Sequence, residues 1–329
     1  MKNMKSYDVT ALGEVLIDFT PDKKSAKGMP LFECNPGGAP ANVLAAVSKF
    51  GAKSAFIGKV GKDAFGKFLA DNLKSLNIDI SGLCEDTNVP TTLAFVTLDD
   101  KGDRSFSFYR KPGADVMLTF EDIDKSKLED TKIFHFGSVS LTDDPAYTAT
   151  IEAAKYAKEH GAVISYDPNY RPLLWQDRST AVKRMLEGAC LADIIKVSDE
   201  ELALLTGECD LERGAQKLMA CGASLVFVSL GAKGSYYYNK NASRFMYTYD
   251  VATIDTTGAG DAFLGAILYL LKDKSVCEIA SLCAGELDEI LDFANASGSL
   301  TTTVTGAAPA IPSLDEIEKC RRSVPKLER

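Results

Sequence analysis

Short apolar runs typical of buried β-strands alternate with helical segments along most of this 329-residue chain. The runs predict strands at residues 8–19 (interrupted at Gly13), 55–61, 78–83, 132–138, 162–169, 193–198 and 225–231, with an antiparallel pair at 236–238 and 245–249. Helices are predicted within 37–51 and 67–77, and at 145–160, 179–190, 199–206 and 211–221. Strands that alternate with helices in this way build a parallel sheet covered by helices on both faces. We therefore predict a three-layer α/β/α fold with a mostly parallel central sheet.

Residues 91–110 interrupt this alternation. Two strand-like runs flank Asp100-Lys101-Gly102-Asp103, which has the composition of a hairpin turn. An inserted antiparallel hairpin of this kind is a lid, a dimer-forming sheet or a simple surface addition, and the pattern leaves the three open. Along the second run, Phe108 is expected on the face opposite Ser107 and Tyr109. No linker rich in proline or serine divides the chain, which predicts a single domain over residues 1–329.

Composition excludes several classes of function. The net charge of −9 argues against a nucleic-acid partner and against an anionic membrane surface. No stretch of about 18 uncharged apolar residues is present, so no transmembrane helix is expected, and no apolar core of a signal peptide precedes the first strand. The eight cysteines lie far apart without a C-x-x-C motif, which predicts reduced thiols in a cytoplasmic protein. The two histidines, His135 and His160, are expected to be structural.

The sequence DTTGAGDAF at residues 255–263 places small residues and one carboxylate at the start of an apolar helix. Glycines 258 and 260 let the backbone turn tightly, so that several N–H groups point the same way. A helix N-terminus adds about half a positive charge and unpaired donors, which suit an anion. Asp261 is placed to accept a proton from a hydroxyl that attacks this anion, and the helix N-terminus is expected to keep the pKa of Asp261 low. The alternative is an ordinary N-cap Asp after a glycine turn.

Further polar loops follow the predicted parallel strands, where open α/β sheets place their ligand sites. They are GGAPAN at 37–42, DPNYR at 167–171, SDEE at 198–201 and SLGAKG at 229–234. GAKGS lacks the spacing of a phosphate-binding P-loop, and GAGDAFLG lacks the G-x-G-x-x-G spacing of a dinucleotide site. A nicotinamide-dependent oxidoreductase is therefore not supported.

Taken together and in this order, GGAPAN, VGKDAFG at 60–66 and DTTGAGDAF resemble the signatures of the ribokinase/pfkB family of sugar kinases. The resemblance covers essentially the whole chain. It implies a ribokinase-like fold with a small antiparallel β lid formed by about residues 19–35 and 91–112. Within the family, GEVLIDF at 13–19, DPNYRPLLW at 167–175 and KVSDEE at 196–201 are most similar to fructokinases.

By this resemblance, Asp261 is the catalytic base, and the N–H groups of Gly258, Ala259 and Gly260 form the anion hole for the transferred phosphoryl group. The implied substrate-binding residues are Asp18, Gly37, Gly38, Asn42, Phe95, Arg110, Arg171 and Asp261 itself. Phe95 and Arg110 are expected to close over the sugar from the hairpin, although Arg110 is also consistent with a solvated charge. Arg171 is either a phosphate clamp or a surface ion-pair partner.

The nucleotide and its ions have implied positions of their own. The nucleotide-binding residues are Asn169, Arg171, Ser198, Ser229, Gly231, Gly234, Gly258, Gly260 and Asn295. The family often has Asn where this chain has Ser198, which leaves the phosphate or metal contact there open, while Glu201 matches an acidic position that holds Mg²⁺ indirectly. A monovalent-cation site, as in some relatives, is implied at Asp255, Thr257, Thr301, Val304 and Gly306.

The resemblance implies an ATP-dependent kinase that converts D-fructose to fructose 6-phosphate, with ATP and Mg²⁺ as cofactors and K⁺ left open. The alternatives are a 2-keto-3-deoxygluconate kinase, for which Arg110 offers a cation to the substrate carboxylate, and another pfkB-family sugar or nucleoside kinase. A catalytically silent regulatory binding protein is a third, disfavoured because the base and the glycine cradle are intact. The expected partners are the sugar, ATP and a second copy of the chain, joined through the β lid.

Overall fold

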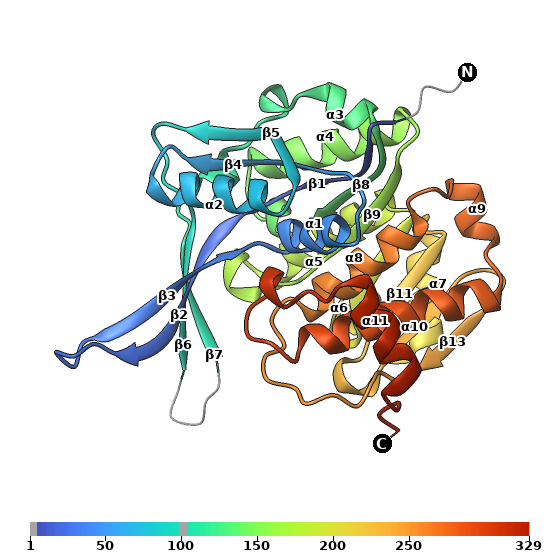
Figure 1. Ribbon diagram of the computed structural model, residues 1–329. Helices are drawn as coiled ribbons and strands as arrows, with labels where there is room; N and C mark the ends of the chain where they lie inside the picture. Colours follow the sequence, from blue (N-terminus) through green and yellow to red (C-terminus); the bar gives the residue numbers. More distant parts are fainter. Residues whose placement is uncertain (1–4, 99–103, 329) are drawn as a thin grey trace.

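The computed structural model describes residues 5–98 and 104–328, and its centre is a nine-stranded sheet (Figure 1). Its strand order is β13-β12-β11-β10-β9-β8-β1-β4-β5. The strands are β1 (Tyr7–Leu12), β4 (Ser54–Gly61), β5 (Ile78–Asp86), β8 (Thr131–Gly137), β9 (Val163–Asp167), β10 (Ile194–Ser198), β11 (Leu225–Ser229), β12 (Ser235–Tyr238) and β13 (Ser243–Met246). All neighbours from β5 to β11 pair in parallel, and β12 and β13 are antiparallel, as predicted.

Two apolar clusters, one on each face of this sheet, confirm the three layers. Successive strand residues belong to opposite clusters, for example Phe227 to one and Val226 and Val228 to the other. One face is covered by α1 (Ala39–Lys49), α2 (Ala64–Ser75), α8 (Ala259–Leu271), α9 (Val276–Ser281), α10 (Ala284–Thr301) and α11 (Leu314–Ser323). The other is covered by α3 (Lys125–Glu129), α4 (Ala146–Glu159), α5 (Arg178–Leu191), α6 (Asp199–Thr206) and α7 (Leu211–Ala220).

A smaller sheet projects from the body of the molecule (Figure 1). Its order is β3-β2-β6-β7, with β2 (Leu16–Lys24), β3 (Pro30–Gly37), β6 (Leu93–Leu98) and β7 (Arg104–Tyr109). We call it the β lid. Each hairpin is antiparallel, which confirms the predicted antiparallel lid, and the two hairpins are joined by parallel pairing of β2 with β6. The hairpin turn predicted at 100–103 lies outside the described residues.

The strand predicted at 8–19 is two strands that belong to different sheets. β1 ends at Leu12 in the large sheet, and β2 begins at Leu16 and enters the β lid. Residues on both sides of the break, such as Leu12 and Ile17, are fully buried, so the apolar pattern continues across it, and only the predicted interruption at Gly13 marks it in the sequence. A single domain over residues 1–329 remains our proposal. Within the described residues, no helix has the length and apolar character that crossing a bilayer requires.

Candidate functional site

Three adjoining cavities lie where the carboxyl ends of the parallel strands meet the start of α8. The central cavity (about 420 Å³) is lined by Asp18, Asn42, Lys196 and Asp261 among others. The Ser198 cavity (about 530 Å³) shares Asn169, Arg171 and Lys196 with it. The Asn295 cavity (about 340 Å³) meets the central cavity at Thr256 and Gly260. This is the edge at which open α/β sheets bind ligands.

The start of α8 is built as the sequence predicts. Gly258 is the N-cap residue with φ 76°, and a Cβ added there would lie 2.6 Å from Cβ of Ala307, so only glycine fits. The first-turn N–H groups of a helix have no intrahelical acceptor. Of these, the N–H of Ala259 donates to the Thr256 carbonyl oxygen at 3.3 Å. Gly258 and Gly260 line the central cavity, whereas Ala259 lines the Asn295 cavity.

Asp261 is held by a residue in the first turn of α1, just after the glycine loop at 37–38. The Nδ2 of Asn42 donates to Oδ2 of Asp261 at 2.9 Å. Burial raises the pKa of Asp261 to about 6; Asp167 also raises it, while Asn42, Lys196 and Arg171 act to lower it. The expectation of a low pKa is wrong, because loss of hydration outweighs the stabilisation expected from the helix N-terminus.

A buried ion pair that sequence analysis did not assign lies beside Asp261. The Nζ of Lys196, on β10, is 2.8 Å from Oδ2 of Asp167, at the end of β9. A Cβ added at Gly260 would lie 3.2 Å from this Nζ, so the ammonium faces the first turn of α8. Burial acts to lower the pKa of Lys196, but Asp167 and Glu201 outweigh it, and the net shift is upward. In the sequence, the position of Lys196 inside the apolar run DIIKVS was the one sign that this lysine is buried.

Glu14, to which sequence analysis gave no role, also lines the central cavity, and it packs against the glycine loop at 37–38. Gly38 has φ 117°, and a Cβ there would lie 2.4 Å from the carbonyl oxygen of Glu14. The Oε1 of Glu14 accepts a hydrogen bond from the N–H of Ala39 at 3.0 Å, whereas its buried Oε2 has no partner among the described residues. Burial raises the pKa of Glu14 to about 7. Gly37 does not line the cavity, but a Cβ there would collide with Asp18.

The pleat of the β lid decides which of its side chains reach the cavity. Asp18, Ala94 and Phe108 are register partners on one face, and both Asp18 and Phe108 line the central cavity. Phe95 lies on the opposite face, stacked on Phe19 at 4.7 Å between ring centroids. The expectation that Phe95 covers the cavity is wrong, because neighbouring strand residues alternate between faces. Phe108 takes that place.

Arg110 is also not available to a substrate. It is 7% exposed, and its Nε lies 2.7 Å from Oδ2 of Asp115. Its other nitrogens donate to Oγ1 of Thr142 at 2.7 Å and to the carbonyl oxygen of Val139 at 3.0 Å. The guanidinium therefore supports the cavity wall at Val139 rather than closing over the cavity, in contrast to both sequence-based interpretations of this residue.

The Ser198 cavity gathers the residues predicted around phosphates and Mg²⁺: Asn169, Arg171, Ser198 and Glu201. Ser198 and Glu201 form a reciprocal cap of α6, in which the Ser198 Oγ accepts from Glu201 N–H and Glu201 Oε2 accepts from Ser198 N–H. Oε1 of Glu201 accepts from the N–H of Tyr170 at 2.7 Å. Both carboxylate oxygens thus already hold backbone donors, which suits an indirect metal contact better than a direct one.

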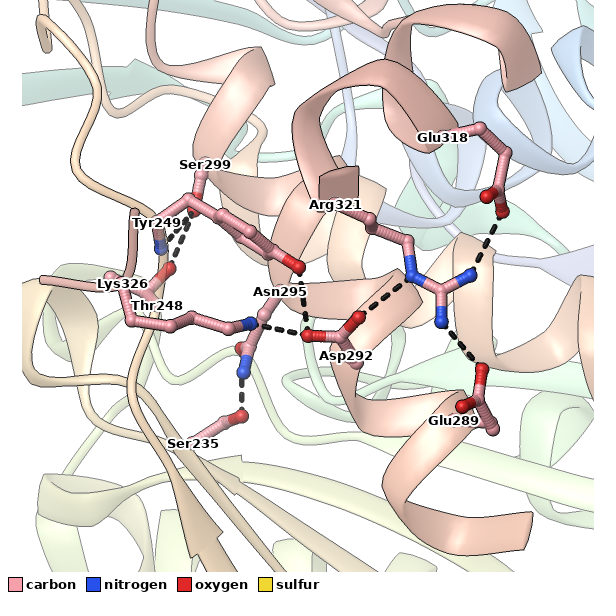
Figure 2. Close-up of polar contacts among 10 residues, drawn as sticks. All are labelled: Ser235, Thr248, Tyr249, Glu289, Asp292, Asn295, Ser299, Glu318, Arg321 and Lys326. Carbon is pink, nitrogen blue, oxygen red and sulfur yellow. Dashed lines mark hydrogen bonds and ion pairs between the residues drawn. The ribbon is translucent and has the colours of Figure 1, made fainter. Parts of the chain in front are cut away.

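The Asn295 cavity brings together Ser229, Gly231, Gly234 and Asn295, as the resemblance implies. Figure 2 shows Asn295 joined to Ser235, whose Oγ donates to its Oδ1 at 2.7 Å. Its buried Nδ2 has no partner within the part of the chain that the structure describes, so both N–H donors of this amide remain for a ligand. The other walls are mainly apolar and include Val251, Phe263 and Leu327.

Of the residues implied in a monovalent-cation site, Asp255 and Thr257 lie on the turn before Gly258, whereas Val304 and Gly306 lie on the loop that follows α10. Oδ1 of Asp255 accepts from the N–H of Thr257 at 3.0 Å, and Oδ2 accepts from the N–H of Gly306 at 3.0 Å. Thr301 is buried at the end of α10, and Val304 is exposed. One carboxylate thus ties the 255–257 turn to the 302–306 loop.

Comparisons with known proteins agree with this geometry. Residues 7–314 match the model of the pfkB family carbohydrate kinases. The chain is 44% identical over 325 residues to the probable fructokinase-5 of Arabidopsis thaliana, covering 97% of this chain and 98% of the relative.

Solved structures give the same relationship. The fructokinase of Xylella fastidiosa with bound ATP superposes with a TM-score of 0.89 at 34% identity, covering 96% of this chain and 98% of the other. A double-mutant fructokinase of Vibrio cholerae O395, with fructose, ADP and a potassium ion bound, superposes with a TM-score of 0.84 at 33% identity over 96% and 99% of the two chains. Identity at this level over nearly the full length, together with the match to the family model, means that this chain belongs to the pfkB family of carbohydrate kinases.

Proposed function

We propose that this chain is an ATP-dependent fructokinase that converts D-fructose to fructose 6-phosphate. The observation that carries the proposal is the meeting of Asp261, Asn42 and Lys196 with the N-terminus of α8 at one cavity. Phosphoryl transfer needs positioning and charge stabilisation more than covalent help, and these groups supply both. The relatives named fructokinase support fructose as the acceptor.

In the proposed mechanism, the sugar lies in the central cavity between Asp18, Asn42 and Asp261. Asp261 orients the attacking hydroxyl and takes its proton as the new P–O bond forms and the bond between the γ-phosphorus and the bridging oxygen of the leaving ADP breaks. The N–H groups of Gly258 and Gly260 and the ammonium of Lys196 stabilise the charge on the transferred phosphoryl group. Ala259 contributes less, since its N–H is directed at Thr256.

The nucleotide is proposed to extend from the Ser198 cavity to the Asn295 cavity. Asn169 and Arg171 border both the sugar and phosphate regions, and the Asn295 cavity, with its apolar walls and the unpartnered amide NH2 of Asn295, suits the base. Ser229, Gly231 and Gly234 line the same cavity, and we propose that they also contact the nucleotide.

Both ions are proposed to bind with few side-chain ligands. Among the described residues, no cluster of three or more His, Cys, Asp or Glu side chains is arranged to hold a metal. Mg²⁺ would therefore be held mainly by the nucleotide's phosphates, with Glu201 acting through water, and would neutralise charge on them. The paired loops around Asp255, Thr257 and Gly306 suit a monovalent cation coordinated by backbone carbonyls, and the potassium ion in the Vibrio cholerae structure supports K⁺.

The choice of sugar is tested by measuring ADP release with fructose, ribose, 2-keto-3-deoxygluconate and adenosine. A 2-keto-3-deoxygluconate kinase is disfavoured, because the positive charge of Arg110 is already paired with Asp115. Turnover confined to fructose supports the proposal. Turnover only with another acceptor would exclude fructose as the substrate but keep the assignment as a kinase, and no turnover with any acceptor would favour a silent binding protein.

The proposed location of the protein is the cytoplasm. One relative, the probable fructokinase-6 of Arabidopsis thaliana, is chloroplastic by name.

The pH dependence of turnover provides a second prediction. Because a base must be ionised to accept a proton, kcat/KM for fructose should fall about tenfold per pH unit below the pKa of Asp261, about 6. The controls are Asp18→Asn and Glu14→Gln, which remove the two other cavity carboxyls, whose pKa values burial raises to about 6 and about 7. If the acid limb disappears in either variant, the limb belongs to the substituted residue and the assignment of the base is contradicted. Circular dichroism at each pH tests whether unfolding of the protein causes the fall in kcat/KM.

The β lid is proposed to form a homodimer. On the face opposite the cavity, Phe19, Phe32, Phe95 and Tyr109 form a chain of ring contacts, and Phe32 and Tyr109 are 40% and 66% exposed. Contiguous exposed aromatic surface of this kind is typical of protein interfaces. The edge strands β3 and β7 also leave backbone groups unpaired.

Sedimentation velocity tests the dimer. The unaltered chain should sediment at twice the mass of one chain, and Tyr109→Asp should shift it to monomer, because a carboxylate would be buried in the interface. The matched control is Phe245→Asp, at an exposed aromatic on β13 at the far edge of the large sheet. A monomer at every concentration would end this proposal without affecting the kinase assignment.

A further inference from the structure

The C-terminal segment, residues 324–328, contributes a wall to the Asn295 cavity. Leu327 is half-buried and lines this cavity together with Tyr249, Asn295 and Ser299. No motif of the sequence points to this segment, which follows α11 and lies beyond the region matched by the family model. Its position therefore adds a residue to the site that the resemblance does not supply.

Backbone hydrogen bonds attach the segment to the cavity wall in the manner of an added strand. The N–H of Leu327 donates to the carbonyl oxygen of Thr248 at 2.8 Å, and the N–H of Asp250 donates to that of Pro325 at 2.9 Å. Lys326 forms an antiparallel bridge with Tyr249 between these two bonds. The register brings the side chain of Leu327 to the cavity.

Asp292 on α10 ties this arrangement together (Figure 2). Its Oδ1 accepts hydrogen bonds from the Tyr249 hydroxyl at 2.8 Å and from Nζ of Lys326, and its Oδ2 accepts from Nε of Arg321 at 2.7 Å. The Lys326 ammonium also lies 3.6 Å from the centroid of the Tyr249 ring. One carboxylate thus joins α10, α11, the 248–250 segment and the C-terminal segment.

The same face of α10 continues into the cavity. Asp292, Asn295 and Ser299 are spaced three and four residues apart, so they lie in one row along the helix. Ser299 bonds to Thr248 at 2.5 Å between the two hydroxyl oxygens and accepts from the N–H of Tyr249 at 3.3 Å. The position of the C-terminal segment is therefore fixed by the same helix that presents Asn295.

We propose that the C-terminal segment forms the outer wall of the nucleotide-base site, with Leu327 packed against the base and Asp292 as the positioning residue that holds the segment in place. The inference rests on the proposed function in one respect, that the Asn295 cavity receives the base. The segment then determines affinity for the nucleotide and has no part in sugar binding or in the transfer step.

Kinetics with three variants tests the proposal: Leu327→Ala, Asp292→Asn and a chain that ends at Val324. The KM for ATP should rise about fivefold for Leu327→Ala and about tenfold for the truncated chain and Asp292→Asn, because apolar contact with the base is lost. The KM for fructose and kcat at saturating ATP should stay within about twofold.

Further variants test the ion pair between Lys326 and Asp292. Lys326→Met removes this pair and should weaken nucleotide binding, whereas Lys326→Arg should keep the pair and the affinity. Arg322→Ala, on the exposed side of α11, is the matched control.

The outcomes separate this proposal from the fructokinase assignment. An unchanged KM for ATP in Leu327→Ala overturns the proposal, even if the truncated chain fails to fold. Equal rises in the KM for ATP and for fructose also overturn it, since that pattern indicates general loss of structure. If the unaltered chain phosphorylates no sugar, the proposed function fails, and calorimetric titration with ADP still decides whether Leu327→Ala weakens nucleotide binding.

Discussion

Asp261→Asn should reduce kcat for fructose phosphorylation by about 10³-fold while leaving the affinity for ATP within about threefold of the unaltered protein. The substitution keeps the size of the side chain and an oxygen that accepts the hydrogen bond from Asn42. It removes only the group that takes the proton from the attacking hydroxyl. Steady-state kinetics and calorimetric titration with ATP together measure the two effects.

A control at the other end of the same helix separates this effect from general damage. Asp273, just beyond α8, has an exposed carboxylate paired with Lys132, and Asp273→Asn should leave kcat unchanged. Turnover of Asp261→Asn within tenfold of the unaltered chain would contradict the role of Asp261 as base. A loss of ATP binding equal to the loss of kcat would indicate a structural role instead.

Lys196→Met should reduce kcat by about 10²- to 10³-fold, because it removes a buried positive charge beside the transferred phosphoryl group. The single substitution also leaves Asp167 as an unpaired buried carboxylate, which costs about 3–5 kcal/mol of folding free energy. Measurements of kcat must therefore be accompanied by thermal unfolding, so that the fraction of folded enzyme is known.

The double variant Asp167→Asn/Lys196→Met distinguishes catalysis from structure. It removes both charges, so neither is left unpaired, and stability should return close to that of the unaltered chain. If Lys196 stabilises the transition state, kcat stays low in the double variant. Recovery of kcat together with stability would mean that Lys196 only neutralises Asp167, and would contradict its catalytic role.

The order of strands and helices could be predicted from the spacing of apolar residues, because strands and helices bury their side chains with different periods. The apolar runs at 193–198 and 225–231 became β10 and β11, with neighbouring residues packed on opposite faces of the sheet. The sequence marked the break between β1 and β2 only as an interruption at Gly13; the change of sheet could not be predicted, since the flanking residues Leu12 and Ile17 are equally buried. The parallel pairing of β2 with β6 is likewise non-local and leaves no mark in either strand.

The candidate site was predictable where local backbone chemistry encodes it. The turn at Gly258 and the N-terminus of α8 are properties of one short segment, and Asp261 was found with them. Phe95 and Arg110 were misplaced because strand register and a distant partner set their directions. Glu14 and Lys196 were missed because a single charge within an apolar run does not reveal what it faces in the folded chain.

The proposed mechanism depends on the position of the terminal phosphate of ATP relative to Asp261. A crystal structure with fructose and a non-hydrolysable ATP analogue measures it directly. We predict the γ-phosphorus beside the N–H groups of Gly258 and Gly260, with the fructose 6-hydroxyl between it and the Asp261 carboxylate. A γ-phosphate bound away from the start of α8, or a fructose whose 6-hydroxyl does not reach Asp261, would contradict the mechanism.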